Sequence, residues 1–222
     1  MKTATLIVYF LFEILLGYGQ TARESKFNDS LAVQLDSIYF NDQKIRLIID
    51  SMGIKADWQS NQMQSLLREM LVQDSANLIS VKLILDKYGW LGPKVVGNQG
   101  NKAIFLVIQH ADNLTQEKYL PMMREAVKIG NASGNSLALL EDRVALNQGK
   151  KQIYGSQIAM YFDTNKYYVS PLFDPDNVDK RRAVVGLQPI AIYLKKWGID
   201  WDVEQYKKEL PQIEAKEKER NK

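Results

Sequence analysis

Apolar residues recur along the first half of the chain with the spacing of amphipathic helices. In the clearest stretch, Ser30 to Met52, they follow one another at intervals of three and four, and the one missing slot is Asp42. Gly53 ends this pattern. The same reasoning predicts further helices over 58–73, 75–88 with Ser75 as its N-cap, 115–130 with Thr115 as its cap and a kink near Pro121, and 136–148.

One predicted helix, 101–111, is apolar on nearly every side, which predicts that it is buried. Its last part reads "IFLVIQHAD", and Gln109 and His110 follow directly on five apolar residues. His110 is the only histidine of the chain. The preceding segment, 89–100, is rich in glycine and contains Pro93, and this composition predicts a loop.

The pattern changes after residue 149. The stretches "KQIYGSQIAMYF" and "KYYVSPLF" are rich in aromatic and β-branched residues, and "DTN" between them favours a turn, so we predict a β-hairpin. On its first strand Gln152, Tyr154 and Ser156 would share one face. Gly155 would mark a bulge or a close backbone approach. Two short helices are predicted in "NVDKRRAVVG" and "PIAIYLKKWG". The expected fold is mainly α (α+β), a single-domain helical bundle-like core with one β-hairpin near the C-terminal third.

The two ends of the chain differ from its middle. Lys2, the apolar stretch Leu6–Leu16 and the small residues Gly17 and Gly19 are typical of a secretory signal, and the stretch is shorter than the ~20 residues of a spanning helix. We therefore expect a signal peptide at 1–19, a single globular domain at 20–205 and a charged, solvated C-terminal tail at 206–222. The mature protein would be exported, periplasmic or secreted, without an integral membrane span.

Composition narrows the classes of function. The chain is 45% hydrophobic and 25% charged with a net charge of +3, which is typical of a globular protein. Its basic residues are mixed with acidic ones, so no nucleic-acid-binding surface is predicted. The absence of cysteine excludes disulfides and thiolate metal sites, and one histidine makes a zinc site improbable. We expect no metal and no cofactor.

Polar residues that interrupt apolar patterns are the candidate functional groups. Asp42 occupies an apolar slot, and Arg46, four residues later on the same helix, can pair with it. A structural ion pair explains the two residues equally well. His110 is either a core residue satisfied by a neighbour or part of a polar pocket. Asp142 and Arg143 are adjacent in mid-helix and point about 100° apart, so they can serve different partners. Arg181 and Arg182 suit a carboxylate or phosphate, or ion pairs within the protein.

Several of these residues lie in motifs that resemble an uncharacterised bacterial family. The motifs are "IQHAD" (108–112), "LEDRV" (140–144), "GKKQIYGSQ" (149–157) and "DKRRAVVGL" (179–187), with "NDQKIR" (41–46) and "YGW" (88–90) before them. The resemblance is to a domain of unknown function with the signature QHA, DR, QxYG(T/S)Q and RRxxxGL. It covers about Leu31 to Leu194. It implies that the functional positions are Asp42, Gln43, Arg46, Gln109, His110, Asp142, Arg143, Gln152, Tyr154, Gln157 and Arg182.

Three interpretations of these positions remain open. In an envelope hydrolase, His110 or Asp142 would be the acid–base and Arg143 or Arg182 would stabilise negative charge on a small polar or anionic substrate. A glycosidase would need two carboxylates, and Asp42 with Asp142 are the candidates. In a non-catalytic binding module the same groups would only recognise a ligand or partner. In the third interpretation they form a buried structural network.

Overall fold

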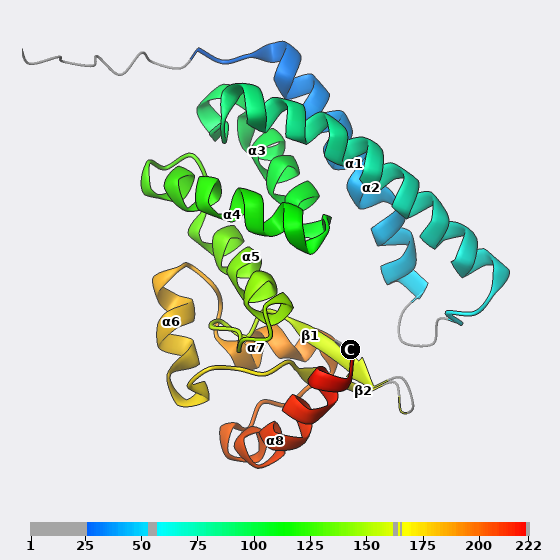
Figure 1. The fold of residues 1–222 in the computed structure, drawn as a ribbon, viewed down its shortest axis with the longest axis vertical. Helices are drawn as coiled ribbons and strands as arrows, with labels where there is room; N and C mark the ends of the chain where they lie inside the picture. The colour runs from blue at the N-terminus through cyan, green and yellow to red at the C-terminus, as the bar shows by residue number, and fades with distance from the viewer. Residues whose placement is uncertain (1–25, 53–56, 162–163, 165, 221–222) are drawn as a thin grey trace, which may run out of the picture.

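The computed structural model describes residues 26–52, 57–161, 164 and 166–220. The predicted signal peptide at 1–19 and Gln20 lie outside these residues. Helices dominate, and two short strands form one antiparallel hairpin, so the predicted mainly α fold with a hairpin is confirmed (Figure 1). The elements are α1 Asp29–Met52, α2 Asn61–Tyr88, α3 Pro93–His110, α4 Asn113–Lys128, α5 Gly134–Asn147, β1 Ile158–Tyr161, β2 Lys166–Val169, η1 Pro175–Asn177, α6 Val178–Val184, α7 Ile190–Leu194, η2 Lys195–Trp197 and α8 Val203–Arg220.

The first hydrophobic core is built around α3. This helix packs against α1 and α2, which run side by side, and α4 packs on α5 (Figure 1). Ala103, Ile104, Val107 and Ile108 of α3 are all buried in this core, as its apolar sequence predicts. The helix starts earlier than expected, at Pro93, and its first turns are separated from the rest by Gly97 at φ 72°. The prediction of a loop over 89–100 is therefore wrong for most of its length.

Helix α2 is continuous, whereas the sequence predicts two helices separated near residue 74. Ser60 is its N-cap, and the Ser60 side chain accepts a hydrogen bond from the Met63 backbone N–H. Ser75 is not a cap: its hydroxyl donates to the Leu71 carbonyl, 2.8 Å away, within the helix. The apolar face that begins at Met63 continues through Val81 and makes one helix more favourable than two.

Helix α4 also begins earlier than expected. Asp112, and not Thr115, is the N-cap, because its carboxylate accepts the Thr115 backbone N–H at 2.9 Å. Pro121 lies inside this helix, as predicted. This cap places Asp112 directly after the end of α3 at His110.

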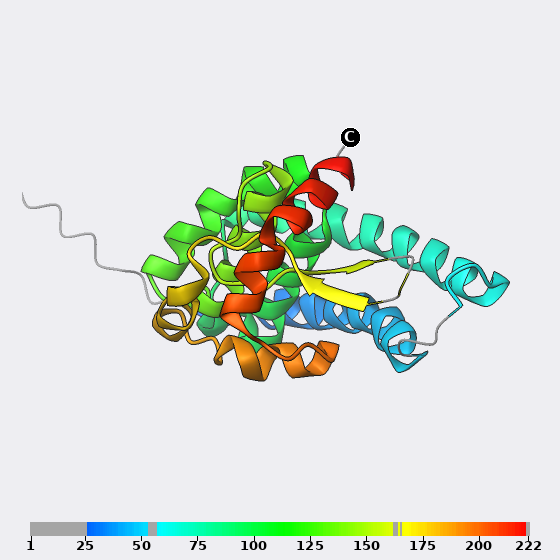
Figure 2. The same ribbon diagram turned by 90° about the horizontal axis from the view of Figure 1, so that it is seen from below.

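A second hydrophobic core holds the C-terminal third together. In the hairpin Ile158 pairs with Val169, and the two short helices α6 and α7 form as predicted. The expectation of a solvated tail from residue 206 is wrong for the part described, since α8 packs on this core (Figure 2). Tyr206 and Ile213 of α8 are buried, and the Tyr206 hydroxyl bonds to the backbone of Leu172 and Ser170. None of the helices in the described ranges is long and apolar enough to cross a membrane.

Candidate functional site

Asp42 is the centre of a polar cluster between α1, α2 and α3. Its residue is only 1% exposed, because position 42 belongs to the inward-facing stripe of α1. Burial of an ionised carboxylate is costly unless hydrogen bonds and counter-charges compensate it. Gln43 donates to Asp42 Oδ2 at 2.7 Å, and Arg46 lies 3.3 Å from Oδ1. The prediction that Asp42 faces inward and is charge-paired is confirmed.

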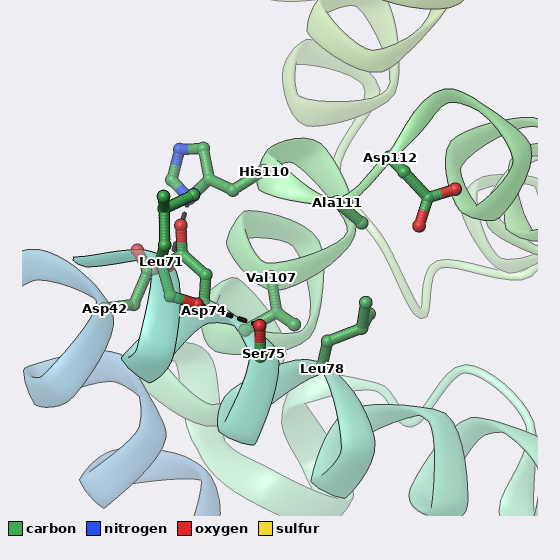
Figure 3. A pocket seen from close by; sticks show the side chains of 9 residues that line it. All are labelled: Asp42, Leu71, Asp74, Ser75, Leu78, Val107, His110, Ala111 and Asp112. Carbon is green, nitrogen blue, oxygen red and sulfur yellow. Dashed lines mark hydrogen bonds and ion pairs between the residues drawn. The ribbon is translucent and has the colours of Figure 1, made fainter. Parts of the chain in front are cut away.

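His110 is the second partner of Asp42 and comes from the last residue of α3. Its Nδ1 atom lies 3.0 Å from Asp42 Oδ1, and its side chain is 21% exposed. In Figure 3 one ring nitrogen faces the carboxylates below the ring and the other points away from them. The lone histidine therefore joins an enclosed carboxylate on one side to a partly open space on the other.

Arg46 connects the cluster to α2. Its two terminal nitrogens bind both carboxylate oxygens of Asp74 at 2.9 and 2.7 Å, and one of them also donates to the Asp42 carbonyl. This forked geometry is specific to arginine. The group of Asp42, Gln43, Arg46, Asp74 and His110 is called the Asp42 cluster below. Its two carboxylates are compensated by one guanidinium and by the hydrogen bond to the imidazole.

The electrostatics of Asp42 keep it ionised. Burial alone raises the pKa of Asp42, but the hydrogen bond and charge of His110, the Gln43 amide and Arg46 together lower it below its ordinary value of 3.8. An ionised carboxylate is only an acceptor, so Asp42 requires a proton on Nδ1 of His110. In neutral His110 the lone pair of the ring then lies on Nε2.

A cavity of about 190 Å³ lies against this cluster. Leu71, Leu78 and Val107 form its apolar part (Figure 3). The other lining residues are Asp42, Asp74, Ser75, His110, Ala111 and Asp112. The hydroxyl of Ser75 donates to the Leu71 carbonyl. In the described ranges, no group of three or more histidine, cysteine or acidic residues is arranged to hold a metal.

Asp142 lies in a different polar cluster. Its residue is 0% exposed, and its two oxygens accept backbone N–H groups of Ile153, Tyr154 and Ser156 at 2.6 to 3.2 Å. Burial raises the pKa of Asp142, while these N–H groups lower it. Residues 152–157 are therefore a loop wrapped around Asp142, and their predicted strand alternation is wrong. Both oxygens are enclosed, so we assign Asp142 a structural role in place of the predicted catalytic one.

Three further predicted site residues hold this same loop. Gln152 is fully buried: its amide donates to the Gln157 and Ser170 carbonyls and accepts the Gln157 N–H. The Gln157 amide donates to Leu139 O and Ser156 Oγ. Arg182, 1% exposed, donates to the carbonyls of Gln188 and Tyr154 at 2.6 Å. These contacts are internal, and they support the interpretation of a structural network for this part of the predicted set.

Gly155 shows why the loop has this sequence. Its φ is +67°, and a Cβ atom at this position would lie 2.7 Å from Ile190 Cδ1. Only glycine combines this backbone conformation with so close a neighbour. The close backbone approach predicted for Gly155 is confirmed, although the residue is not in a strand.

The remaining predicted residues lie apart from the cavity. Tyr154 directs its hydroxyl to Glu141 Oε2, 3.5 Å away. Gln109 is buried and does not line the cavity, and no described residue hydrogen-bonds to its side-chain oxygen. Arg143 is half-buried, and its Nε atom is buried with no hydrogen-bond partner in the described ranges. Of the predicted set, the structure therefore brings together Asp42, Gln43, Arg46 and His110.

Asp74, Ser75 and Asp112 contribute to the site but were not predicted. The false break of the helix at residue 74 obscured Asp74, which lies in the middle of α2 and faces α1. A usable signal was present: Met63, Met70, Asn77 and Ile84 recur every seven residues, which is the spacing of one continuous helical face.

Comparison with known proteins gives one match. The model of a family of unknown function, DUF6624, matches residues 30–202, which include every residue of the Asp42 cluster and of the loop around Asp142. Searches of curated proteins and of solved structures found no match. Since the match covers well over half of the sequence, the chain belongs to the DUF6624 family.

Proposed function

We propose that this protein is an exported hydrolase in which His110 is the general acid–base for a small polar or anionic substrate. The observation that carries the proposal is the 3.0 Å contact between His110 Nδ1 and the buried Asp42 Oδ1, at the wall of a cavity. A carboxylate on one ring nitrogen fixes the tautomer and the orientation of an imidazole and leaves the other nitrogen for proton transfer.

Water is the nucleophile in this proposal. His110 Nε2 takes a proton from a water molecule while the water oxygen attacks the substrate, and the same proton then passes to the leaving oxygen. The positive charge on the ring during this step is stabilised by Asp42. Ser75 also lines the cavity, but its hydroxyl is directed to the Leu71 carbonyl, and no contact places it on His110.

Ester and phosphate-ester hydrolysis are favoured over glycoside hydrolysis. The glycosidase interpretation needs Asp142 as the second carboxylate, and both Asp142 oxygens are enclosed by backbone N–H groups. Hydrolysis with one imidazole needs no second carboxylate. The extracytoplasmic location remains a prediction from the pattern at residues 1–19.

The test is turnover by the purified full chain with p-nitrophenyl acetate, p-nitrophenyl phosphate and p-nitrophenyl glycosides. We expect hydrolysis of an ester or phosphate ester that falls by about 10²–10⁴-fold in His110→Gln, the usual contribution of a general acid–base. Asn41→Ala, an exposed change next to Asp42, is the control. Equal rates for His110→Gln and the unchanged protein would overturn the proposal. Saturable binding of these compounds without turnover would support a non-catalytic binding module instead.

A further inference from the structure

Arg143 is half-buried and, unlike three other arginines, has no acceptor among the described residues. Arg46 binds Asp74, Arg181 binds Asp174, and Arg182 donates to two carbonyl oxygens. Arg143 has no hydrogen bond or ion pair in the part of the chain that the structure describes, and its Nε atom is buried. A buried N–H donor without an acceptor is costly, so the Nε–H group of Arg143 needs an acceptor from outside the described residues.

One aromatic residue and one cation act on the pKa of Arg143. Burial lowers the pKa of Arg143, Tyr193 raises it, and the charge of Arg46 lowers it further. No carboxylate among the described residues is close enough to shift this pKa. The Lys196 ammonium lies 4.5 Å from the centre of the Tyr193 ring, and the Arg182 guanidinium lies 4.9 Å from it. Arg46 and Arg182 already have acceptors, so an added anion would bind to Arg143 itself, with the Tyr193 ring and the Lys196 ammonium beside it.

We propose that Arg143 binds an oxyanion, a phosphate or carboxylate group, between α1, α5 and the α7–η2 segment. The planar guanidinium carries a fork of N–H donors that matches two oxygens of such a group. An oxyanion would satisfy the unpaired Nε–H and neutralise the charge beside Arg46. Tyr193 is held in place because its hydroxyl donates to the Ser156 carbonyl at 2.7 Å, so it forms a fixed wall.

This site would define the class of substrate. Arg46 belongs to the Asp42 cluster and is also the cation whose charge acts on Arg143. Arg143 therefore lies within electrostatic range of the cluster that contains His110. The assignment of the oxyanion as the substrate's own charged group rests on the proposed function. The binding of an oxyanion at Arg143 does not.

The experiment measures thermal unfolding of the full chain with inorganic phosphate, sulfate or acetate, each compared with sodium chloride at the same ionic strength. A ligand that binds only the folded state raises Tm as its concentration increases. We expect this rise with at least one oxyanion. Phosphate and sulfate without acetate would indicate a phosphate or sulfate group, and acetate alone a carboxylate group.

Arg143→Met is the decisive variant, because it keeps the length of the side chain and removes the charge. We expect it to have a higher Tm than the unchanged protein in chloride alone and to lose the rise caused by the oxyanion. Arg68→Met, at an exposed position of α2, is the matched control and should keep that rise. If Arg143→Met does not fold, Arg143→Lys keeps a charge but not the fork, and should bind about tenfold or more weakly.

Two results would overturn the assignment: no oxyanion stabilises the unchanged protein beyond chloride, or the Arg143 variants keep the full rise. His110→Gln separates this inference from the proposed function. If the oxyanion effect depends on Arg143 but turnover does not depend on His110, the proposed hydrolase mechanism is contradicted and the oxyanion site is supported. If turnover depends on His110 but no oxyanion raises Tm, only the proposed oxyanion site at Arg143 is contradicted.

Discussion

The imidazole of His110 and the carboxylate of Asp42 are separated by 68 positions in sequence and by 3.0 Å in space. The contact forms because α1 and α3 pack closely and because position 42 faces inward at the level where α3 ends. Together with Arg46, this contact offsets the free-energy cost of burying the Asp42 carboxylate.

Loss of the Asp42 carboxylate should destabilise the protein strongly. Asp42→Ala leaves Arg46 and His110 without their common partner inside the helical layer. We expect a loss of about 3–5 kcal/mol in the free energy of unfolding, as for other broken buried pairs. Urea denaturation measures it, and Asn41→Ala should change stability by less than about 0.5 kcal/mol. An equally small effect for Asp42→Ala would show that the cluster contributes little to stability.

The contribution of Asp42 should depend on pH with a definite sign. In the folded state its pKa is lower than the ordinary value of 3.8, so the unfolded state binds more protons as pH falls. The stabilisation is complete above pH 3.8 and disappears as pH falls through the folded-state pKa. We therefore expect the stability difference between the unchanged protein and Asp42→Asn to shrink as pH falls from about pH 4 to about pH 2. Urea unfolding across this range measures the difference, and a constant difference down to pH 2 would contradict the assigned electrostatics.

Asp142→Asn should lower the free energy of unfolding and leave the turnover rate per folded molecule unchanged. The amide group would direct N–H donors at the backbone N–H groups of Ile153, Tyr154 and Ser156. We expect a loss of roughly 2–4 kcal/mol. Asp179→Asn is the matched comparison. Asp179 is exposed, and its carboxylate accepts only one backbone N–H group, that of Ile190, so this change should cost less stability. If Asp142→Asn were fully stable and inactive, Asp142 would be catalytic after all.

The loop around Asp142 should not tolerate a methyl group at Gly155. Gly155→Ala combines strain at φ +67° with a clash against Ile190. Gly149 has φ +70° and open space around it, so Gly149→Ala reports the backbone strain alone. We expect the Gly155 variant to be less stable than the Gly149 variant by about 1–3 kcal/mol. Equal unfolding midpoints for the two variants would show that Ile190 moves aside freely.

Export should remove the first 19 residues. The small residues Gly17 and Gly19 follow the apolar stretch, so we expect the protein recovered outside the cytoplasm of a bacterial host to begin at Gln20. Mass analysis of the intact protein measures this directly. Recovery of a chain that retains its N-terminal segment from Met1 would contradict cleavage.

Local patterns were sufficient to predict most helices and the inward position of Asp42. Periodicity reports which side chains share a face, and an aspartate in an apolar slot must face inward if the helix forms at all. The buried character of α3 was predictable for the same reason. The close approach at Gly155 was expected from the residue type, since glycine has no Cβ atom. Helix ends were less predictable: Ser75 and Thr115 have the residue types of caps, yet Ser60 and Asp112 hold the caps.

Tertiary structure decided which polar residues meet. The sequence alone placed Asp42, His110 and Asp142 in one candidate set. The fold separates them, because Asp142 is enclosed by the backbone of its own loop while His110 reaches Asp42. It also brings in Asp74, whose role depends on α2 lying beside α1, and packs Tyr206 of the highly charged C-terminal helix into a core. A sequence pattern fixes the face on which a side chain lies. The partner on that face depends on how distant helices pack, and no local pattern carries that information.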